Sequence, residues 1–404
     1  MGELMVATKE KVSDHVYEDV ALVILSKLPL KSLFRFGCVR KSWSLLFKNS
    51  YFMNMFRKNF LSKNPYCNDT SHFLQFREPH RFGHISRPML YSLFGERFQN
   101  MVKLDWPNPF QKDEFHFLVR GCVNGILCIE DDGRDGGILC IEELQRIALW
   151  NTTTGEFKAT PPSPFAFESP CWDPMICLHG FGYDQVKDDY KVIRYISFYP
   201  KTDEDSDETW KDGYHSSLWE IYCLKSNSWR KLDINMPTQA YGGMVQVYMD
   251  GVCHWWGECE TSDEVYLVSF DLYSEVFVKT FIPLNMNDID SRQVFRHLNV
   301  LNGSIGLILN YVESTTFHIS ILGEVGVKES WIKLFIVGPL TCVEHPIGVG
   351  KNGDIYLKKK DNKLVCFNLI TQKIEELGVK GETGQSCQII VYEESLLPIE
   401  RINT

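Results

Sequence analysis

The chain has 404 residues, 44% of them hydrophobic and 23% charged, which is typical of a globular protein with room for two or three domains. Its formal net charge of −10 argues against a nucleic acid as the main partner. No apolar run approaches the roughly 20 residues of a membrane helix. Because no secretory signal precedes the 13 cysteines, we expect reduced thiols and a location in the cytoplasm, the nucleus or both.

A helix is predicted from Val16 to Leu28, because most positions there are apolar at helical spacing. The apolar positions form two stripes, one made of Val16, Val20, Val23, Ile24 and Leu28, the other of Tyr17, Ala21, Leu22 and Leu25. Because two sides of this helix are apolar, only a narrow polar surface remains to contact water. Pro29 disfavours helical geometry at the residue before it and ends the helix.

Two further helices are predicted, from Leu30 to Phe36 and from Val39 to Phe47, with a helical trailer to about Phe60. A segment of roughly 45 residues is below the size at which one core normally hides so much apolar surface. The surplus therefore needs a covering partner, which is either the rest of this chain or another protein.

The stretches LSKLPLKSL at 25–33 and FGCVRKSW at 36–43 resemble an F-box of the plant type. The resemblance implies docking onto the Skp-type adaptor of a cullin-based (SCF) ubiquitin ligase. The apolar side chains expected to bind the adaptor are Val16, Tyr17, Leu22, Leu25, Leu28, Pro29, Leu33, Val39 and Trp43. The family usually opens with Leu-Pro, whereas this chain has Val16-Tyr17, which raises the question of weaker adaptor binding. The alternative is that these helices only cap the remaining domain.

After a polar stretch at 61–71, short strands and turns replace the helical pattern. A strand, a polar turn and a second strand with an aromatic residue recur, as in IALWNTTTGEFK at 147–158. The later copies lie roughly 50 residues apart, the span of one four-stranded propeller blade. The repeats predict six blades, near 72–106, 115–162, 176–233, 243–283, 295–338 and 345–378.

The last strand-like run, at 388–392, is predicted to return to the first blade and close the ring, which removes the exposed edges of an open sheet. Seven blades are the alternative, because the region before Phe115 is poorly patterned. A stack of two β-sandwich domains is the other architecture that this pattern allows.

The stretches GCVNGILC at 121–128, LWNTTTG at 149–155 and GFGYD at 180–184 resemble the plant F-box-associated interaction domain, which is kin to kelch propellers. Paired glycines occur only at 136–137 and 242–243, so the propeller is expected to be kelch-like and not a true kelch repeat. Together the two families imply a substrate receptor of an SCF ligase, in which the helices hold the ligase and the propeller binds a target protein for ubiquitination.

The predicted organisation is thus a small three-helix α unit followed by an all-β propeller. Its parts are a disordered N-terminus at 1–11, the F-box and trailing helix at 12–60, a linker at 61–71 and the propeller at 72–398. Exposed aromatic residues in blade-connecting loops are natural anchors for a target. The candidates are Trp172, Trp210, Tyr214 and Trp256, for which burial in a blade core is the alternative.

We expect no catalytic residue, no metal and no cofactor. The GxGxxG pattern at 348–353 precedes a predicted strand, whereas a dinucleotide site needs a helix there. The cysteine pairs 122/128 and 253/259 are six residues apart, which suits neither a zinc ribbon nor a redox motif. His80 and His84 are better read as loop residues. The alternative function is a propeller hydrolase or carbohydrate-binding protein, which would need convergent carboxylates at the channel mouth.

Overall fold

The computed structural model separates the chain into two compact units, Met1–Ser62 and Lys63–Thr404. The residues that it describes are 18–28, 32–33, 35–36, 43–61, 71–77, 88–95, 97–107, 117–131, 147–165, 172–200, 216–237, 246–258, 265–282, 294–311, 313–350, 353–381, 386–395 and 399. The domain ranges predicted from the sequence stay predictions.

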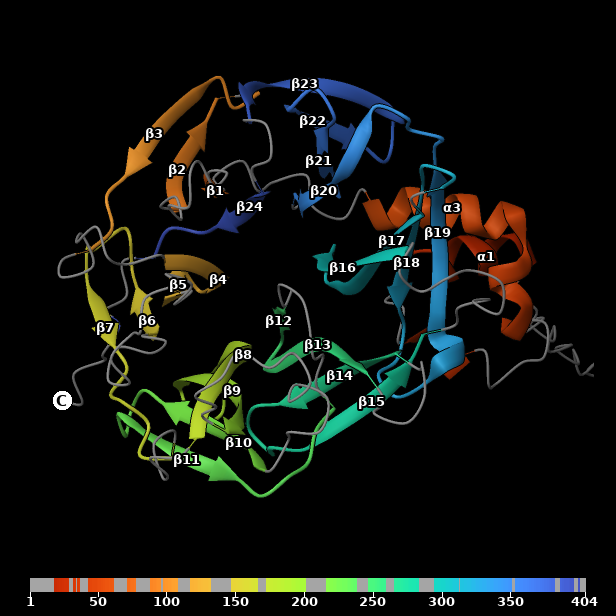
Figure 1. Ribbon diagram of the computed structural model, residues 1–404. Helices are drawn as coiled ribbons and strands as arrows, with labels where there is room; N and C mark the ends of the chain where they lie inside the picture. The colour runs from red at the N-terminus through yellow and green to blue at the C-terminus, as the bar shows by residue number, and fades with distance from the viewer. Residues whose placement is uncertain are drawn as a thin grey trace, which may run out of the picture. The chain divides into compact units, whose positions relative to one another are not determined.

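The first unit is helical in its described parts (Figure 1). It contains α1 (Glu18–Leu25), the 3₁₀ helix η1 (Trp43–Lys48) and α3 (Ser50–Leu61). Residues 32–33 and 35–36 are also helical, whereas 37–42 lie outside the described residues. The predicted helix from Val39 to Phe47 is therefore observed only as a 3₁₀ turn, and the three-helix F-box as a whole remains a prediction.

Local hydrogen bonds explain where these helices begin and end. The side chain of Asn49 caps α3, since its Oδ1 accepts hydrogen bonds from the backbone N–H groups of Tyr51 (2.9 Å) and Phe52 (3.1 Å). At the end of α1, Ser26 Oγ donates to Val23 O (2.8 Å) and accepts from Asn59 Nδ2 (2.8 Å). The second contact ties the end of α1 to α3.

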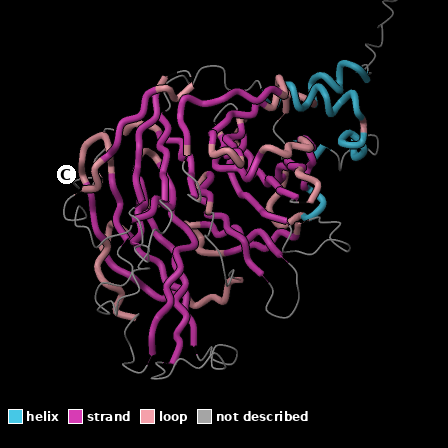
Figure 2. The backbone as a smooth tube through the Cα atoms, turned by 45° about the horizontal axis from the view of Figure 1, so that its top comes forward, coloured by secondary structure: helices cyan, strands magenta, loops and turns pink. Residues whose placement is uncertain are grey.

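The second unit is a six-bladed β-propeller, as the repeats predict (Figures 1 and 2). Each blade is a four-stranded antiparallel sheet. The first three blades are β24 (Ser386–Tyr392), β1 (Ser71–Arg77), β2 (Pro88–Phe94) and β3 (Asn100–Leu104); β4 (Phe117–Val123), β5 (Ile126–Asp131), β6 (Ile147–Trp150) and β7 (Phe157–Ala159); and β8 (Trp172–Asp184), β9 (Asp189–Pro200), β10 (Ser216–Cys223) and β11 (Ser228–Leu232).

The other three blades follow the same order from the innermost to the outermost strand. They are β12 (Val247–Met249), β13 (Val252–Glu258), β14 (Val265–Asp271) and β15 (Phe277–Phe281); β16 (Val294–Leu301), β17 (Ser304–Tyr311), β18 (Thr316–Leu322) and β19 (Trp331–Val337), with the 3₁₀ turn η5 (Lys328–Ser330); and β20 (Val343–Val349), β21 (Ile355–Lys359), β22 (Lys363–Asn368) and β23 (Lys373–Lys380).

The ring closes by pairing its last strand with its first, which confirms the predicted return of residues 388–392. Strand β24 lies antiparallel to β1 with Ile390 opposite Phe73, and it forms the innermost strand of the first blade. Two contacts to the second blade hold the closure: Asn151 Nδ2 donates to Ser395 O (2.9 Å), and the hydroxyls of Thr153 and Tyr392 lie 2.5 Å apart.

The core of the propeller consists of apolar clusters between neighbouring blades. Every residue of β5 is buried, because an inner strand packs on both faces, whereas the outer strand β7 is largely exposed. Tryptophan rings extend between blades and donate to backbone carbonyls: Trp229 Nε1 to Pro161 O (2.8 Å) and Trp331 Nε1 to Phe281 O (3.1 Å). These bonds satisfy indole nitrogens that would otherwise be buried without a partner.

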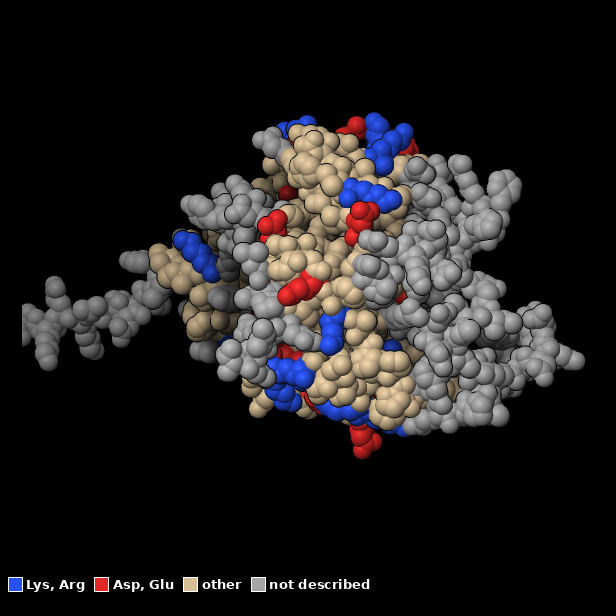
Figure 3. Space-filling model, turned by 90° about the vertical axis from the view of Figure 1, so that its left-hand side faces the viewer, with Lys and Arg blue, Asp and Glu red and all other residues tan. Residues whose placement is uncertain are grey.

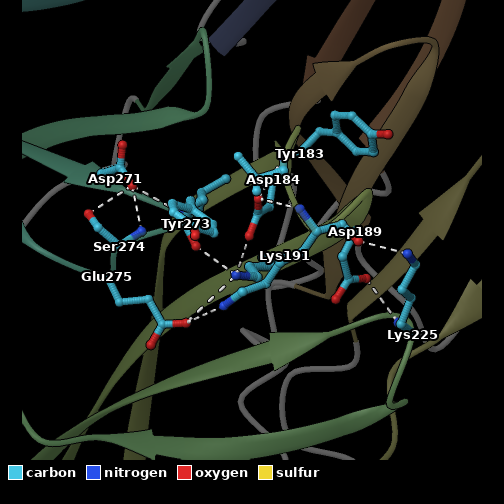
Figure 4. Close-up of polar contacts among 12 residues, drawn as sticks. Tyr183, Asp184, Asp189, Lys191, Lys225, Asp271, Tyr273, Ser274 and Glu275 are labelled. Atoms are coloured by element: carbon cyan, nitrogen blue, oxygen red, sulfur yellow. Dashed lines mark hydrogen bonds and ion pairs between the residues drawn. The ribbon is translucent and has the colours of Figure 1, made fainter.

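A buried ionic network joins the third and fourth blades (Figure 4). Lys191, whose side chain is 1% exposed, donates through Nζ to Asp184 Oδ2 (2.7 Å) and to Leu272 O (2.6 Å). Glu275 Oε1 lies 3.7 Å from the same Nζ and also binds Arg230. Asp184 precedes β9, and Leu272 and Glu275 follow β14, so the lysine fixes one blade against the next.

Candidate functional site

An exposed apolar side of α1 is the main candidate interaction surface of the helical unit. Val20 is 50% exposed, Val23 41% and Ile24 52%, and these three residues are called the α1 face below. The opposite side of the helix is packed, since Ala21 and Leu25 are buried. Leaving three large aliphatic side chains in water is unfavourable, so a contiguous patch of this kind marks a binding surface.

The helical unit has a small apolar core of its own, and α1 packs Ala21 and Leu25 inward, which leaves the α1 face in solvent. The unit buries Leu33, Leu46, Phe52, Met53 and Phe56, and the rings of Phe52 and Phe56 stack with centroids 6.1 Å apart. Further large apolar side chains of the unit remain exposed: Phe36, Leu45 and Tyr51.

The residues predicted to bind an adaptor divide into three groups. Leu25 and Leu33 are buried, and Leu22, Leu28 and Trp43 are half-buried. Val16, Tyr17, Pro29 and Val39 lie outside the residues whose side chains the structure describes. The adaptor contacts predicted on this helix come from both apolar stripes, with Val16 and Leu28 in one and Tyr17, Leu22 and Leu25 in the other. The α1 face was missed, although its three residues share one stripe in the sequence.

The four aromatic residues proposed as target anchors have different outcomes. Trp256 is 5% exposed and belongs to the apolar cluster between the fourth and fifth blades, so its ring is a core residue and not an exposed anchor. Trp172 begins β8, opposite Pro200, but its side chain is not among those described. Trp210 and Tyr214 lie outside the described residues, so these two and Trp172 stay predictions as target contacts.

The residues considered for chemistry are mostly packed within the sheets. His254 is buried in β13 with Nδ1 2.8 Å from Ser269 Oγ, and burial lowers its pKa to about 3. Burial also raises the pKa of Cys122 to about 12, which opposes formation of a reactive thiolate. Cys259, His80 and His84 lie outside the described residues. Among the described residues, no three His, Cys, Asp or Glu side chains are placed to hold a metal ion.

The GxGxxG pattern is a hairpin, as the sequence predicts. Strands β20 and β21 pair across it, Gly350 N–H donates to Asp354 O (2.7 Å), and Gly353 has a φ of 79°. A strand follows where a dinucleotide site would need the N-terminus of a helix. None of the helices that the structure describes has the length and apolar character to cross a bilayer.

Surface charge gives no sign of a nucleic-acid site on the side of the molecule shown in Figure 3. The described Lys and Arg side chains there are interspersed with Asp and Glu and do not form one basic field. A binding surface for a phosphate backbone gathers positive charge in a stripe or patch.

Sequence similarity connects the chain to F-box proteins. The family model described as "F-box associated beta propeller domain" matches residues 133–399. Over 294 residues the chain is 25% identical to F-box protein CPR1 of Arabidopsis thaliana, covering 68% of this chain and 66%, just under two thirds, of that protein. Over 412 residues it is 23% identical to a putative F-box protein of the same plant, covering 96% of this chain and 84% of that protein.

Solved structures add only a distant likeness. The NanB sialidase from Streptococcus pneumoniae gives a TM-score of 0.39 at 8% identity, covering 67% of this chain and 62% of that chain. A likeness this slight carries no argument about activity.

Proposed function

This chain belongs to the family of plant F-box proteins that carry an F-box associated β-propeller domain, and from that premise we propose that it is the substrate-recognition subunit of an SCF-type ubiquitin ligase. The helical unit docks a Skp-type adaptor and through it a cullin scaffold. The propeller binds the target protein. We place this complex in the cytoplasm, the nucleus or both.

The observation that best supports the proposal is the α1 face. Val20, Val23 and Ile24 lie on one side of a helix that already buries its other side. Each of these side chains is about half exposed, so docking would bury the other half and contribute roughly 0.7–1.5 kcal/mol per side chain. Three such residues supply enough apolar contact for the centre of a protein interface.

The catalytic step would belong to other subunits of the ligase. A receptor accelerates ubiquitin transfer by holding a target lysine close to the ubiquitin-charged enzyme, which raises its effective concentration. Under this proposal the chain supplies two binding surfaces and no reacting group. The alternative of a propeller hydrolase has no specific observation in its favour.

The proposal is tested by a double substitution, Val20→Glu with Ile24→Glu, and pull-down of a purified plant Skp-type adaptor. Docking would bury only the exposed half of Val20 and of Ile24, worth about 1.5–3 kcal/mol for the pair, so losing this contact should weaken binding at least about tenfold. Both positions are exposed, so the helical unit should keep its circular dichroism spectrum.

The matched control is Val186→Glu in the turn between β8 and β9, where the valine is 67% exposed. This change puts one of the two new negative charges of the double variant on the propeller instead, and it should leave adaptor binding unchanged. Undiminished adaptor binding by the double variant would rule out the α1 face as the docking surface.

A further inference from the structure

The outer strand of the fourth blade, β15, has an open backbone edge (Figure 1). It ends the strand order of its blade, and no other described strand pairs with its outer side. Asp271 N–H donates to the opposed Val276 O (3.0 Å), which makes them a hydrogen-bonded pair, and such pairs recur at every second residue. The N–H and C=O groups of Phe277 and Lys279 therefore point away from β14, and no described residue binds them.

Exposed valines flank this edge on one face of the blade. Val276 and Val278 are two positions apart, which places both on the same face. Val325 and Val327 come from the turn between β18 and β19. A Cβ at Gly326, between these two, would lie 3.0 Å from Val278 Cγ1, so the turn lies against β15. The four valines are 58%, 41%, 40% and 36% exposed in chain order, and they are called the valine patch below.

Other outer strands show how such an edge is protected. On β23, Gly378 N–H donates to a backbone carbonyl of the first blade (2.7 Å), so that edge is partly covered. On β11, exposed Arg230 and Lys231 place charge at the edge, which discourages pairing. The lysine of β15 gives less protection, because Lys279 Nζ lies 5.3 Å from the ring centroid of Tyr266, over its own blade.

We propose that a second copy of this chain pairs its own β15 with this edge, antiparallel, about a two-fold axis at Val278. In this register Phe277 of one copy and Lys279 of the other exchange both N–H···O bonds, and the symmetry-related pair repeats them. Val278 lies opposite its own counterpart, and the two valine patches join on one face of the continuous sheet. The pairing does not involve the α1 face, so it can fail or hold independently of adaptor docking.

Charge favours this occupant and this register. An axis at Lys279 would place two lysines directly opposite each other, which is destabilising. With the proposed axis, each Lys279 is opposite Phe277 of the other copy, and an ammonium near an aromatic ring is favourable. The exposed charges beside the edge also balance, with Glu324 and Glu329 against Lys279 and Lys328. Two copies can therefore meet here without local repulsion, whereas a strongly charged partner would find no complementary field.

The test is sedimentation velocity of the full chain from about 1 to 100 µM, in about 0.15 M salt to screen its net charge of −10. We expect a monomer–dimer equilibrium with a Kd on the order of 10 µM, because an edge interface is small. Val278→Glu would set two carboxylates opposite each other at the axis, and Lys279→Pro would remove an N–H that the pairing needs. Each should weaken dimerisation at least about tenfold.

Two matched variants control for charge and for loss of the lysine. Lys279→Ala removes the same side chain as Lys279→Pro but keeps the N–H, and it should change the Kd less than about threefold. Val186→Glu adds the same charge in the turn between β8 and β9 and should leave dimerisation unchanged. Lys279→Pro should still fold, because its N–H points away from β14 and an outer strand tolerates proline there.

The register is tested by cysteine cross-linking. A non-hydrogen-bonded pair has its Cα atoms about 4.5 Å apart, within reach of a disulfide. Diamide, which accepts the two electrons and two protons of a thiol pair, should therefore join Val278→Cys into a covalent dimer on a non-reducing gel. Val276→Cys puts a thiol on the same face but opposite Thr280 of the other copy, and it should give no more covalent dimer than the unmodified chain.

Three results would overturn the proposal. The first is a chain that stays monomeric up to about 100 µM, which would leave the edge to a strand of another protein. The second is a dimer whose Kd neither Val278→Glu nor Lys279→Pro changes; if the proline variant does not fold, Val278→Glu decides alone, because its side chain is exposed. The third is equal cross-linking of Val276→Cys and Val278→Cys.

Discussion

Replacing Lys191 with Met should strongly destabilise the propeller. The substitution keeps a long apolar stem but removes the ammonium that donates to Asp184 Oδ2 at 2.7 Å and to Leu272 O at 2.6 Å. Asp184 is 0% exposed, so its carboxylate would stay buried without its cation. Removing one partner of a buried ion pair typically costs 3–5 kcal/mol. We expect about 4 kcal/mol, because Asp184 Oδ1 keeps two backbone N–H donors, each at 3.0 Å.

Urea unfolding followed by tryptophan fluorescence measures this loss in the free energy of unfolding. The companion variant combines Lys191→Met with Asp184→Asn, which removes the orphaned charge while an amide oxygen still accepts the turn hydrogen bonds. This double variant should recover at least about 1–2 kcal/mol relative to Lys191→Met alone. The reasoning is refuted if Lys191→Met costs less than about 1 kcal/mol, or if the second substitution adds to the loss.

The remaining predictions concern the other buried groups. Gln75→Leu should lower the free energy of unfolding, measured in urea, by about 3 kcal/mol. The side chain of Gln75 donates to Phe117 O (3.2 Å) and accepts from the Val119 N–H (3.1 Å), and leucine would leave both buried backbone groups of β4 without this partner. A loss below about 1 kcal/mol contradicts the prediction. Alkylation with iodoacetamide, read by peptide mass mapping, should modify exposed Cys342 rapidly, while buried Cys253 reacts only on unfolding. Stability should fall as the pH drops below about 6.5, by about 1.4 kcal/mol per pH unit for each histidine that burial keeps neutral. The three histidines are His179, His254 and His297, and burial lowers their pKa in the folded protein to about 4, 3 and 4 respectively. Below pH 6.5 the unfolded chain therefore binds more protons than the folded protein, so stability falls as the pH falls. Replacing any one of these histidines with Gln should make the free energy of unfolding depend less steeply on pH.

The blade pattern was predictable because turn chemistry is local. The hairpin turns at Asn124-Gly125 and Asn302-Gly303 place both residues at positive φ, which Asn and Gly tolerate best. Repetition of such turns divides the chain into blades without knowledge of tertiary contacts. The closing strand could be predicted because β24 is an apolar run left over after six complete repeats.

The exposed side of α1 was not predictable, because the two stripes of the helix are almost equally apolar. Which stripe is buried depends on contacts with α3, a segment distant in the sequence. The burial of Trp256 similarly depends on the neighbouring blade.

Closure of the ring by β24 has a consequence for biosynthesis. Strand β1 leaves the ribosome early, but its inner neighbour is made only after all the intervening blades. Until then Phe73, Leu74 and Phe76 have no covering strand, and the backbone edge of β1 is free to pair with other chains. Productive folding of the first blade must therefore wait for the synthesis of β24, and chaperones that shield nascent strands should influence how much folded protein accumulates.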